Sequence, residues 1–315
     1  QLSSSEWTST LNEVAGNNSN GNFTYMAGYE WKGTGFSNAE ISTFFSNSGP
    51  VNKVNGNESN YNDLNEFLDW LANNNGIGCA NHPARNGNLW NWSNPYAKNE
   101  TYLPCVEMIN KNYFHWNDYW NCSENSNCTT YANPSPDVST WSGGVKTALD
   151  LGIRLGFVAG WDYHGDYPGY PTAYTGLVNA PNWTREGVFD TIKKRHTWAA
   201  TDKILMNVYT NNRSSDFVMG DFFSSSSKYL DINYNINASY GKKIQNISLF
   251  FNGIIIEHRS GLNIENAVGS FEINFSDSNE KYIFIEAVEN DGNRSWSSPM
   301  YVISGLKDYS PEVTL

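Results

Sequence analysis

The spacing of apolar residues changes near residue 200, and this change constrains the fold more than any other feature of the chain. Before that point, short apolar runs alternate with helix-length amphipathic segments, whereas beyond it apolar and polar residues alternate singly. Apolar runs separated by helices are typical of a parallel sheet covered on both faces, and single alternation is typical of antiparallel strands with one buried face. The sequence therefore predicts two different halves, 1–201 and 202–315.

The first half has the pattern of an α/β domain. Its four apolar runs are expected to be buried strands, at 23–31, 77–83, 105–110 and 154–164. Three segments with apolar residues at helical spacing are expected to be helices, at 62–76, 142–152 and 184–196. Repeated strand–helix units of this kind predict a parallel, barrel-like sheet over 1–201.

The second half has the pattern of an all-β domain. Six alternating segments are expected to be strands, beginning near residues 203, 229, 243, 270, 281 and 298. Turn sequences such as Asn252-Gly253 and Asp291-Gly292 lie between them. We therefore predict an antiparallel β-sandwich over 202–315.

Charge argues against two classes of partner. The formal net charge is −12, and the longest basic run is Lys193-Lys194-Arg195, so neither a nucleic acid nor an anionic membrane surface would be attracted. No apolar run approaches the ~20 residues that a membrane helix needs. We expect no nucleic-acid partner and no membrane span.

Asn-X-Ser/Thr sequons point to an extracellular or cell-surface glycoprotein with N-linked glycans. Such sequons begin at Asn17, Asn22, Asn57, Asn91, Asn99, Asn121, Asn127, Asn182, Asn212, Asn237, Asn246, Asn274 and Asn293. An asparagine-rich chain also produces sequons by chance, and that alternative stays open. Their spread over both halves favours secretion.

Four cysteines and no Cys-X-X-Cys motif favour disulfides over a zinc knuckle. Three pairings are possible. Cys79 and Cys105 lie at equivalent places in successive apolar runs, so neighbouring parallel strands would bring them together. We predict Cys79–Cys105 and Cys122–Cys128, with free buried thiols as the alternative.

Each apolar run of the first half ends on a side chain that can bind a metal. The runs end at Glu30, at His82, near Glu107, and at the pair Asp162 and His164. In parallel α/β folds reactive residues gather at the carboxyl ends of the strands. Carboxylates and imidazoles placed there can hold divalent ions such as Zn, Mn or Fe. Hydrogen-bonded strand ends are the alternative.

The order of these motifs resembles a known superfamily. The segments "GYEW", "NHPA", "VEMIN" and "GWDYH", followed by "TREGVFDTIKKRHTWAATDKI" and a sandwich closing on "SWSSPMYV", resemble the polymerase and histidinol phosphatase (PHP) superfamily, in a secreted branch with a β-sandwich after the barrel. The resemblance implies a distorted TIM-type α/β barrel that binds up to three divalent metals and hydrolyses phosphoesters.

Carried over to this chain, the resemblance assigns roles to individual residues. The metal ligands would be Glu30, His82, Asp162 and His164. Arg85 would face a substrate phosphate, and Glu107 would support the site, which makes these two the candidate catalytic residues.

Two departures from the family pattern leave two functional hypotheses open. The opening His-x-His motif is missing, which implies an incomplete barrel without its first strands and a beginning at Gln1 that is processed or truncated. Phe36 stands where the branch has a histidine, and it cannot bind a metal. The first hypothesis is a metal-dependent phosphoesterase; the second is a degenerate structural glycoprotein of a surface layer, sheath or filament, whose partner is a cleaved N-terminal segment or further copies of itself.

Overall fold

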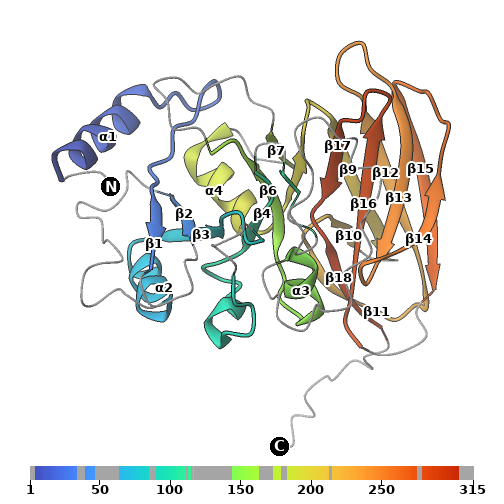
Figure 1. The fold of residues 1–315 in the computed structure, drawn as a ribbon, viewed down its shortest axis with the longest axis horizontal. Helices are drawn as coiled ribbons and strands as arrows, with labels where there is room; N and C mark the ends of the chain where they lie inside the picture. The colour runs from blue at the N-terminus through green and yellow to red at the C-terminus, as the bar shows by residue number, and fades with distance from the viewer. Residues whose placement is uncertain are drawn as a thin grey trace, which may run out of the picture.

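The computed structural model describes most of the chain, and β-strands are its main secondary structure (Figure 1). The described residues are 4–33, 40–46, 64–84, 90–110, 113–114, 116, 144–162, 173–178, 183–212, 215–274 and 279–304. Within them lie eighteen strands, four α-helices and one 3₁₀ helix. The strands form three sheets of six, four and eight members.

The six-stranded sheet belongs to the first half. Its strand order is β1-β2-β3-β4-β5, with β6 pairing β4. The strand bounds are β1 Glu30–Lys32, β2 Glu40–Phe45, β3 Gly76–Ala80, β4 Cys105–Asn110, β5 Tyr113–Phe114 and β6 Gly156–Gly160. The pairs β3–β4 and β4–β6 are parallel, whereas β1–β2, β2–β3 and β4–β5 are antiparallel.

Helices accompany this sheet, and three of them lie within the segments 62–76, 142–152 and 184–196, where the sequence predicts them. The bounds are α1 Ser4–Asn17, α2 Leu64–Asn73, η1 Pro95–Lys98, α3 Val145–Asp150 and α4 Arg185–Lys193. In α2, Leu64, Phe67, Leu68 and Leu71 form one buried face, and each such side chain contributes about 1.5–3 kcal/mol. The Thr184 hydroxyl caps α4 by accepting a 3.0 Å hydrogen bond from the Gly187 N–H.

The expectation of a barrel is wrong. Within the described residues, the first-half sheet is mixed and open, with no closure between its edge strands. The run 23–31 forms a strand only over Glu30–Lys32, and β2, which the sequence analysis did not predict, lies antiparallel between β1 and β3. A TIM-type barrel needs parallel strands joined by crossover helices. The antiparallel pairs around β2 are incompatible with that arrangement.

The second half forms a β-sandwich-like pair of sheets, as predicted. The four-stranded sheet has the order β10-β9-β12-β15, and the eight-stranded sheet has the path β11-β18-β16-β17-β8-β7, with β13 pairing β16 and β14. The bounds are β7 Tyr174–Leu177, β8 Thr197–Ala200, β9 Leu205–Asn212, β10 Ser215–Val218, β11 Phe222–Ser225, β12 Tyr229–Asn237, β13 Ile244–Phe251, β14 Ile254–Arg259, β15 Asn266–Asn274, β16 Lys281–Glu289, β17 Arg294–Ser297 and β18 Met300–Ser304.

Apolar and polar residues alternate along these strands, and the apolar side chains form a core between the two sheets. In β12 the even-numbered residues from Leu230 to Ile236 are buried, and they belong to the same apolar cluster as Leu249 and Ile285 of the facing sheet. The predicted turn Asn252-Gly253 is present, with positive φ at both residues, and it joins β13 to β14. Single alternation in the sequence therefore predicted the buried face correctly.

The two halves share strands and core. Strands β7 and β8 precede residue 202 yet belong to the eight-stranded sheet, and β8 pairs β17. One apolar cluster extends from Trp7 in α1 to Trp296 in β17. In Figure 1, β6 of the six-stranded sheet and β7 of the eight-stranded sheet lie side by side. The first-half sheet is therefore built directly onto the sandwich.

Side-chain hydroxyls join β6 and the residue before it to the second half. Tyr301 Oη contacts both the Leu155 N–H (2.7 Å) and the Leu155 carbonyl (2.8 Å). Ser298 Oγ accepts from the Phe157 N–H at 2.8 Å. Thr175 Oγ1 accepts a 2.8 Å hydrogen bond from the N–H of Ala159 in β6. These hydroxyls satisfy backbone groups that would otherwise be unpaired beside a buried strand.

Candidate metal centre

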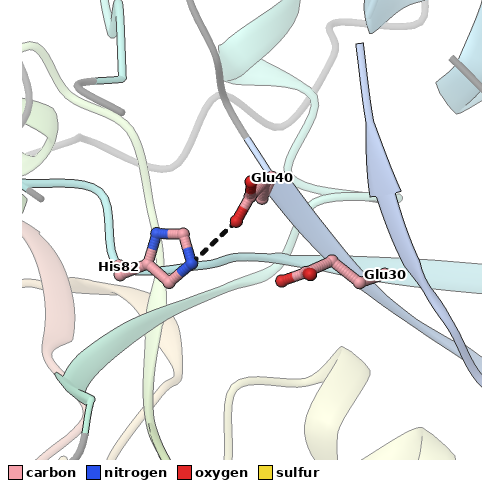
Figure 2. Close-up of side chains that lie close together, drawn as sticks. All are labelled: Glu30, Glu40 and His82. Atoms are coloured by element: carbon pink, nitrogen blue, oxygen red, sulfur yellow. Dashed lines mark ion pairs between the residues drawn. The ribbon is translucent and has the colours of Figure 1, made fainter. Parts of the chain in front are cut away.

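Three neighbouring strands bring two carboxylates and an imidazole together. Glu30 lies in β1, Glu40 lies in β2, and His82 is the second residue after the end of β3. One ligand atom of each lies within 4.8 Å of the others, and the three side chains point toward one another (Figure 2). The sequence analysis predicted Glu30 and His82 for this site but missed Glu40.

Strand register explains why the two glutamates meet. Glu40 is opposite Lys32 and Glu30 is opposite Ser42 in the antiparallel β1–β2 pair. Residues two apart on a strand share a face, so Glu30 and Glu40 are diagonal neighbours on the same face. The other face, with Trp31 and Ile41, is buried in the core.

Glu40 is held as an anion. Its Oε2 lies 2.9 Å from His82 Nε2, and its Oε1 lies 2.6 Å from Lys32 Nζ. The hydrogen bond from His82, with the Lys32 ammonium, lowers the pKa of Glu40 from 4.5 to about 2 despite partial burial. An ionised carboxylate next to an imidazole is a suitable donor set for a divalent cation.

Glu30 lies in a more repulsive environment. Burial, followed by the negative charge of Glu40, raises the pKa of Glu30. Asn81 Nδ2 donates a 2.5 Å hydrogen bond to Glu30 Oε1, while Asn81 Oδ1 accepts from the Ser42 N–H at 3.1 Å. The buried Asn81 amide therefore fixes the Glu30 carboxylate relative to β2.

His82 is buried and has an unusual backbone conformation. Its φ is +25°, a region that L-residues seldom occupy. Its N–H donates a 2.7 Å hydrogen bond to Glu107 Oε2, which stabilises this geometry. Strained backbone of this kind is concentrated at functional sites.

Glu107 supports the site from β4. Its Oε2 also accepts a 3.0 Å hydrogen bond from Asn110 Nδ2. Burial raises the pKa of Glu107 from 4.5 to about 7, and the hydrogen bonds from His82 and Asn110 only partly oppose this. A methyl group on Gly160 of β6 would lie 2.0 Å from Glu107 Oε1, so a larger residue there would displace the Glu107 carboxyl group. Glu107 therefore contacts the His82 backbone, and its supporting role at the site stays a prediction.

Asp162 lies just beyond β6 and near the cluster. Its negative charge contributes to raising the pKa of both Glu30 and Glu107. Like His82, it has positive φ, +48°. The other predicted residues of the site, His164 and Arg85, lie outside the described residues, as does Phe36.

The predicted disulfide Cys79–Cys105 is confirmed. The two cysteines are opposite each other in the parallel β3–β4 pair, with a Cα–Cα distance of 4.6 Å. It joins the strands that lead to His82 and Glu107, and both cysteines are buried. Cys122 and Cys128 lie outside the described residues.

The asparagines of the sequons differ in how exposed they are. Asn17, Asn22, Asn91 and Asn274 are exposed, and Asn99, Asn237, Asn246 and Asn293 are half-buried. Asn57, Asn121, Asn127 and Asn182 lie outside the described residues, and the side chain of Asn212 is not described. Glycosylation stays a prediction at each position.

A second acidic cluster lies at one end of the sandwich. Asp202, Glu289 and Asp291 have ligand atoms within 4.8 Å of one another. The Ser239 hydroxyl lies 2.7 Å from Glu289 Oε1, and Lys242 Nζ lies 2.8 Å from Asp291. The Ser239 hydroxyl and the Lys242 ammonium therefore stabilise the carboxylates of this cluster.

Comparisons with known proteins do not identify a family. No family model and no curated protein matches the chain. Among solved structures, a Jonesia denitrificans lytic polysaccharide monooxygenase is weakly similar, with a TM-score of 0.21 and 11% identity over 27% of this chain. The match spans 57% of that enzyme's chain, and at this TM-score it supports no conclusion. In the described part of the chain, no helix is long and apolar enough to cross a membrane.

Proposed function

We propose that the protein binds a divalent cation through Glu30, Glu40 and His82 and hydrolyses a phosphoester at this site. The convergence of the three ligand atoms within 4.8 Å supports the proposal. Two carboxylates and one imidazole suit Zn²⁺, Mn²⁺ or Fe²⁺. Glu40, which is held ionised beside His82, supplies a donor that the predicted ligand set lacked.

The electrostatics of the site also favour a cation. Four carboxylates, from Glu30, Glu40, Glu107 and Asp162, lie around one imidazole, and their mutual repulsion contributes to the raised pKa of Glu30 and Glu107. A bound divalent ion would relieve this repulsion. When bound, such an ion lowers the pKa of a water molecule and polarises a phosphoryl oxygen.

The chain's own residues have separate roles in this proposal. Glu30, Glu40 and His82 hold the cation, and Asn81 keeps the Glu30 carboxylate oriented by its 2.5 Å hydrogen bond. Glu107 fixes the His82 backbone and, because of its raised pKa, can carry a proton near neutral pH. Asp162 adds negative charge near the site, and this charge favours a positive group there. Arg85 stays a candidate for contact with the phosphate.

Metal analysis and turnover test the proposal together. Protein purified in its intact form should contain at least one equivalent of Zn, Mn or Fe by inductively coupled plasma mass spectrometry. Glu40→Gln should lose that metal. Asp291→Asn serves as the matched control, because it alters the second acidic cluster and should retain the metal.

Phosphatase assays distinguish the two functions. The metal-loaded protein should hydrolyse p-nitrophenyl phosphate or its bis-ester, and Glu40→Gln should not. Stoichiometric metal without turnover would support the structural glycoprotein of a surface layer, sheath or filament, in which the ion only joins β1, β2 and β3. Metal content equal in wild type and Glu40→Gln would refute the proposed site.

A further inference from the structure

Three large aromatic side chains are exposed on two segments that are distant in sequence. Phe23 is 56%, Tyr25 40% and Trp183 55% exposed. The two segments are held together, because the Trp183 carbonyl accepts hydrogen bonds from the Gly21 N–H (3.2 Å) and from Thr24 Oγ1 (2.6 Å). We call Phe23, Tyr25 and Trp183 the exposed aromatic patch.

The fold fixes this patch at the surface. Phe23 and Tyr25 pack edge to face with ring centroids 4.9 Å apart. Trp183 has φ +44°, which is strained for a bulky residue, and it lies directly before the Thr184 cap of α4. Exposed apolar patches on soluble proteins mark surfaces that something else covers.

A sequon lies inside the patch. The sequon is Asn22-Phe23-Thr24; its Asn22 is exposed and lies in the turn that backbone hydrogen bonds between Ser19 and Phe23 close. Among the described residues, the Asn22 side-chain amide makes no hydrogen bond, whereas the Asn17 amide donates to the Glu13 carbonyl at 3.0 Å. Asn22 therefore presents a free amide nitrogen next to exposed rings.

We propose that Asn22 carries an N-linked glycan whose first sugars cover the exposed aromatic patch. Sugar rings have apolar C–H faces that pack on aromatic side chains, while their hydroxyls stay in water. The confirmed disulfide is compatible with the oxidising compartments in which such glycans are attached. This proposal does not depend on the metal centre.

The transfer has a defined chemistry and order. Asn22 Nδ2 forms a bond to the anomeric carbon of a polyprenyl-phosphate-linked or pyrophosphate-linked oligosaccharide. The bond from that carbon to the phosphate oxygen breaks, the lipid phosphate leaves, and Nδ2 loses one proton. In the folded chain Thr24 Oγ1 donates to Trp183, so we infer that transfer precedes docking of this turn.

Mass spectrometry of the protein from its own source tests the modification. The peptide containing Asn22 should have a mass increase equal to whole sugar residues. Asn22→Gln and Thr24→Ala should lose this increase. Thr24→Ser is the matched control, because it keeps both the sequon and a hydroxyl that can bond the Trp183 carbonyl. An unmodified Asn22 peptide in the native protein would overturn the proposal.

Binding of an apolar dye tests whether the glycan covers the patch. Asn22→Gln should raise the fluorescence of bound anilinonaphthalene sulfonate by roughly twofold or more, and adding Trp183→Ala should reverse this rise. A glycosylated Asn22 without any dye difference would refute the covering role. If unmodified protein instead dimerises, and Trp183→Ala breaks the dimer, the patch is a subunit interface and the proposal fails.

Discussion

Gly160→Ala tests the packing that positions His82. The added methyl group would lie 2.0 Å from Glu107 Oε1 and 3.2 Å from Glu107 Cδ, well inside ordinary contact distance. Glu107 cannot move away without weakening its hydrogen bonds to the His82 N–H (2.7 Å) and Asn110 (3.0 Å). Overpacking typically costs about 1–3 kcal/mol, and a weakened buried hydrogen bond to a charged group costs a similar amount.

We therefore expect Gly160→Ala to lower the free energy of unfolding by roughly 2–4 kcal/mol. Urea denaturation in EDTA measures this change without metal. Since Glu107 orients the His82 backbone, Mn²⁺ affinity measured by calorimetry should also fall by about 10-fold or more. Both effects should appear in the same variant.

Gly16→Ala is the matched control for Gly160→Ala. A methyl group there meets nothing within 4 Å, and Gly16 lies inside α1. Alanine is the better helix former by about 0.5–1 kcal/mol, so this variant should be as stable as wild type or slightly more so. Wild-type stability and Mn²⁺ affinity in Gly160→Ala would show that Glu107 is not fixed against β6 and would refute the reasoning.

Three further predictions concern the scaffold of the site. Tyr301→Phe leaves the Leu155 N–H and carbonyl without their hydroxyl partner and should lower the free energy of unfolding by about 1–3 kcal/mol; no change in a urea melt would contradict the bridge. Replacing both Cys79 and Cys105 by alanine opens a loop with a sequence separation of 26 and should cost about 3–4 kcal/mol, measured in the same way against the oxidised wild type. Glu107 binds its proton more tightly in the folded state, because burial raises its pKa from 4.5 to about 7, so metal-free wild type should lose roughly 3 kcal/mol relative to Glu107→Gln as pH rises from about 4.5 to 7. A difference between the two proteins that does not vary with pH would contradict it.

The period of the hydrophobic residues predicted individual helices and strands correctly, but it also led to the prediction of a barrel, which is wrong. The helical spacing of Leu64, Phe67 and Leu71 predicted α2, and alternation predicted the buried residues of β12, because both depend on neighbouring residues. A barrel depends instead on which strands pair and in which direction. β2 pairs with β1 through residues 8 to 12 positions apart and with β3 through residues 31 to 39 positions apart, and local period encodes neither the choice nor the direction of these pairings.

Glu40 shows why the site was only partly predictable. Glu30 and His82 follow or end continuous apolar runs, so they are visible as polar ends of buried strands. Glu40 begins the short alternating strand Glu40–Phe45, and its alternation of half-buried and buried residues is the available signal. The resemblance places a histidine where this chain has Phe36, which cannot bind a metal, whereas the structure brings in a carboxylate from Glu40, four residues later. Only the cross-strand register of β1 and β2 places it beside Glu30.

The sandwich helps to position the residues of the proposed metal centre. Strand β6 carries Gly160, which packs against Glu107, and leads directly to Asp162. One side of β6 pairs with β4, and the other is held by hydroxyls of Thr175, Ser298 and Tyr301 from the second-half sheet. Because Glu107 in turn fixes the His82 backbone, the geometry of the metal centre depends on residues more than a hundred positions later in the chain. Both halves therefore help to position these residues, and the apolar cluster that extends from Trp7 to Trp296 contains side chains of both halves.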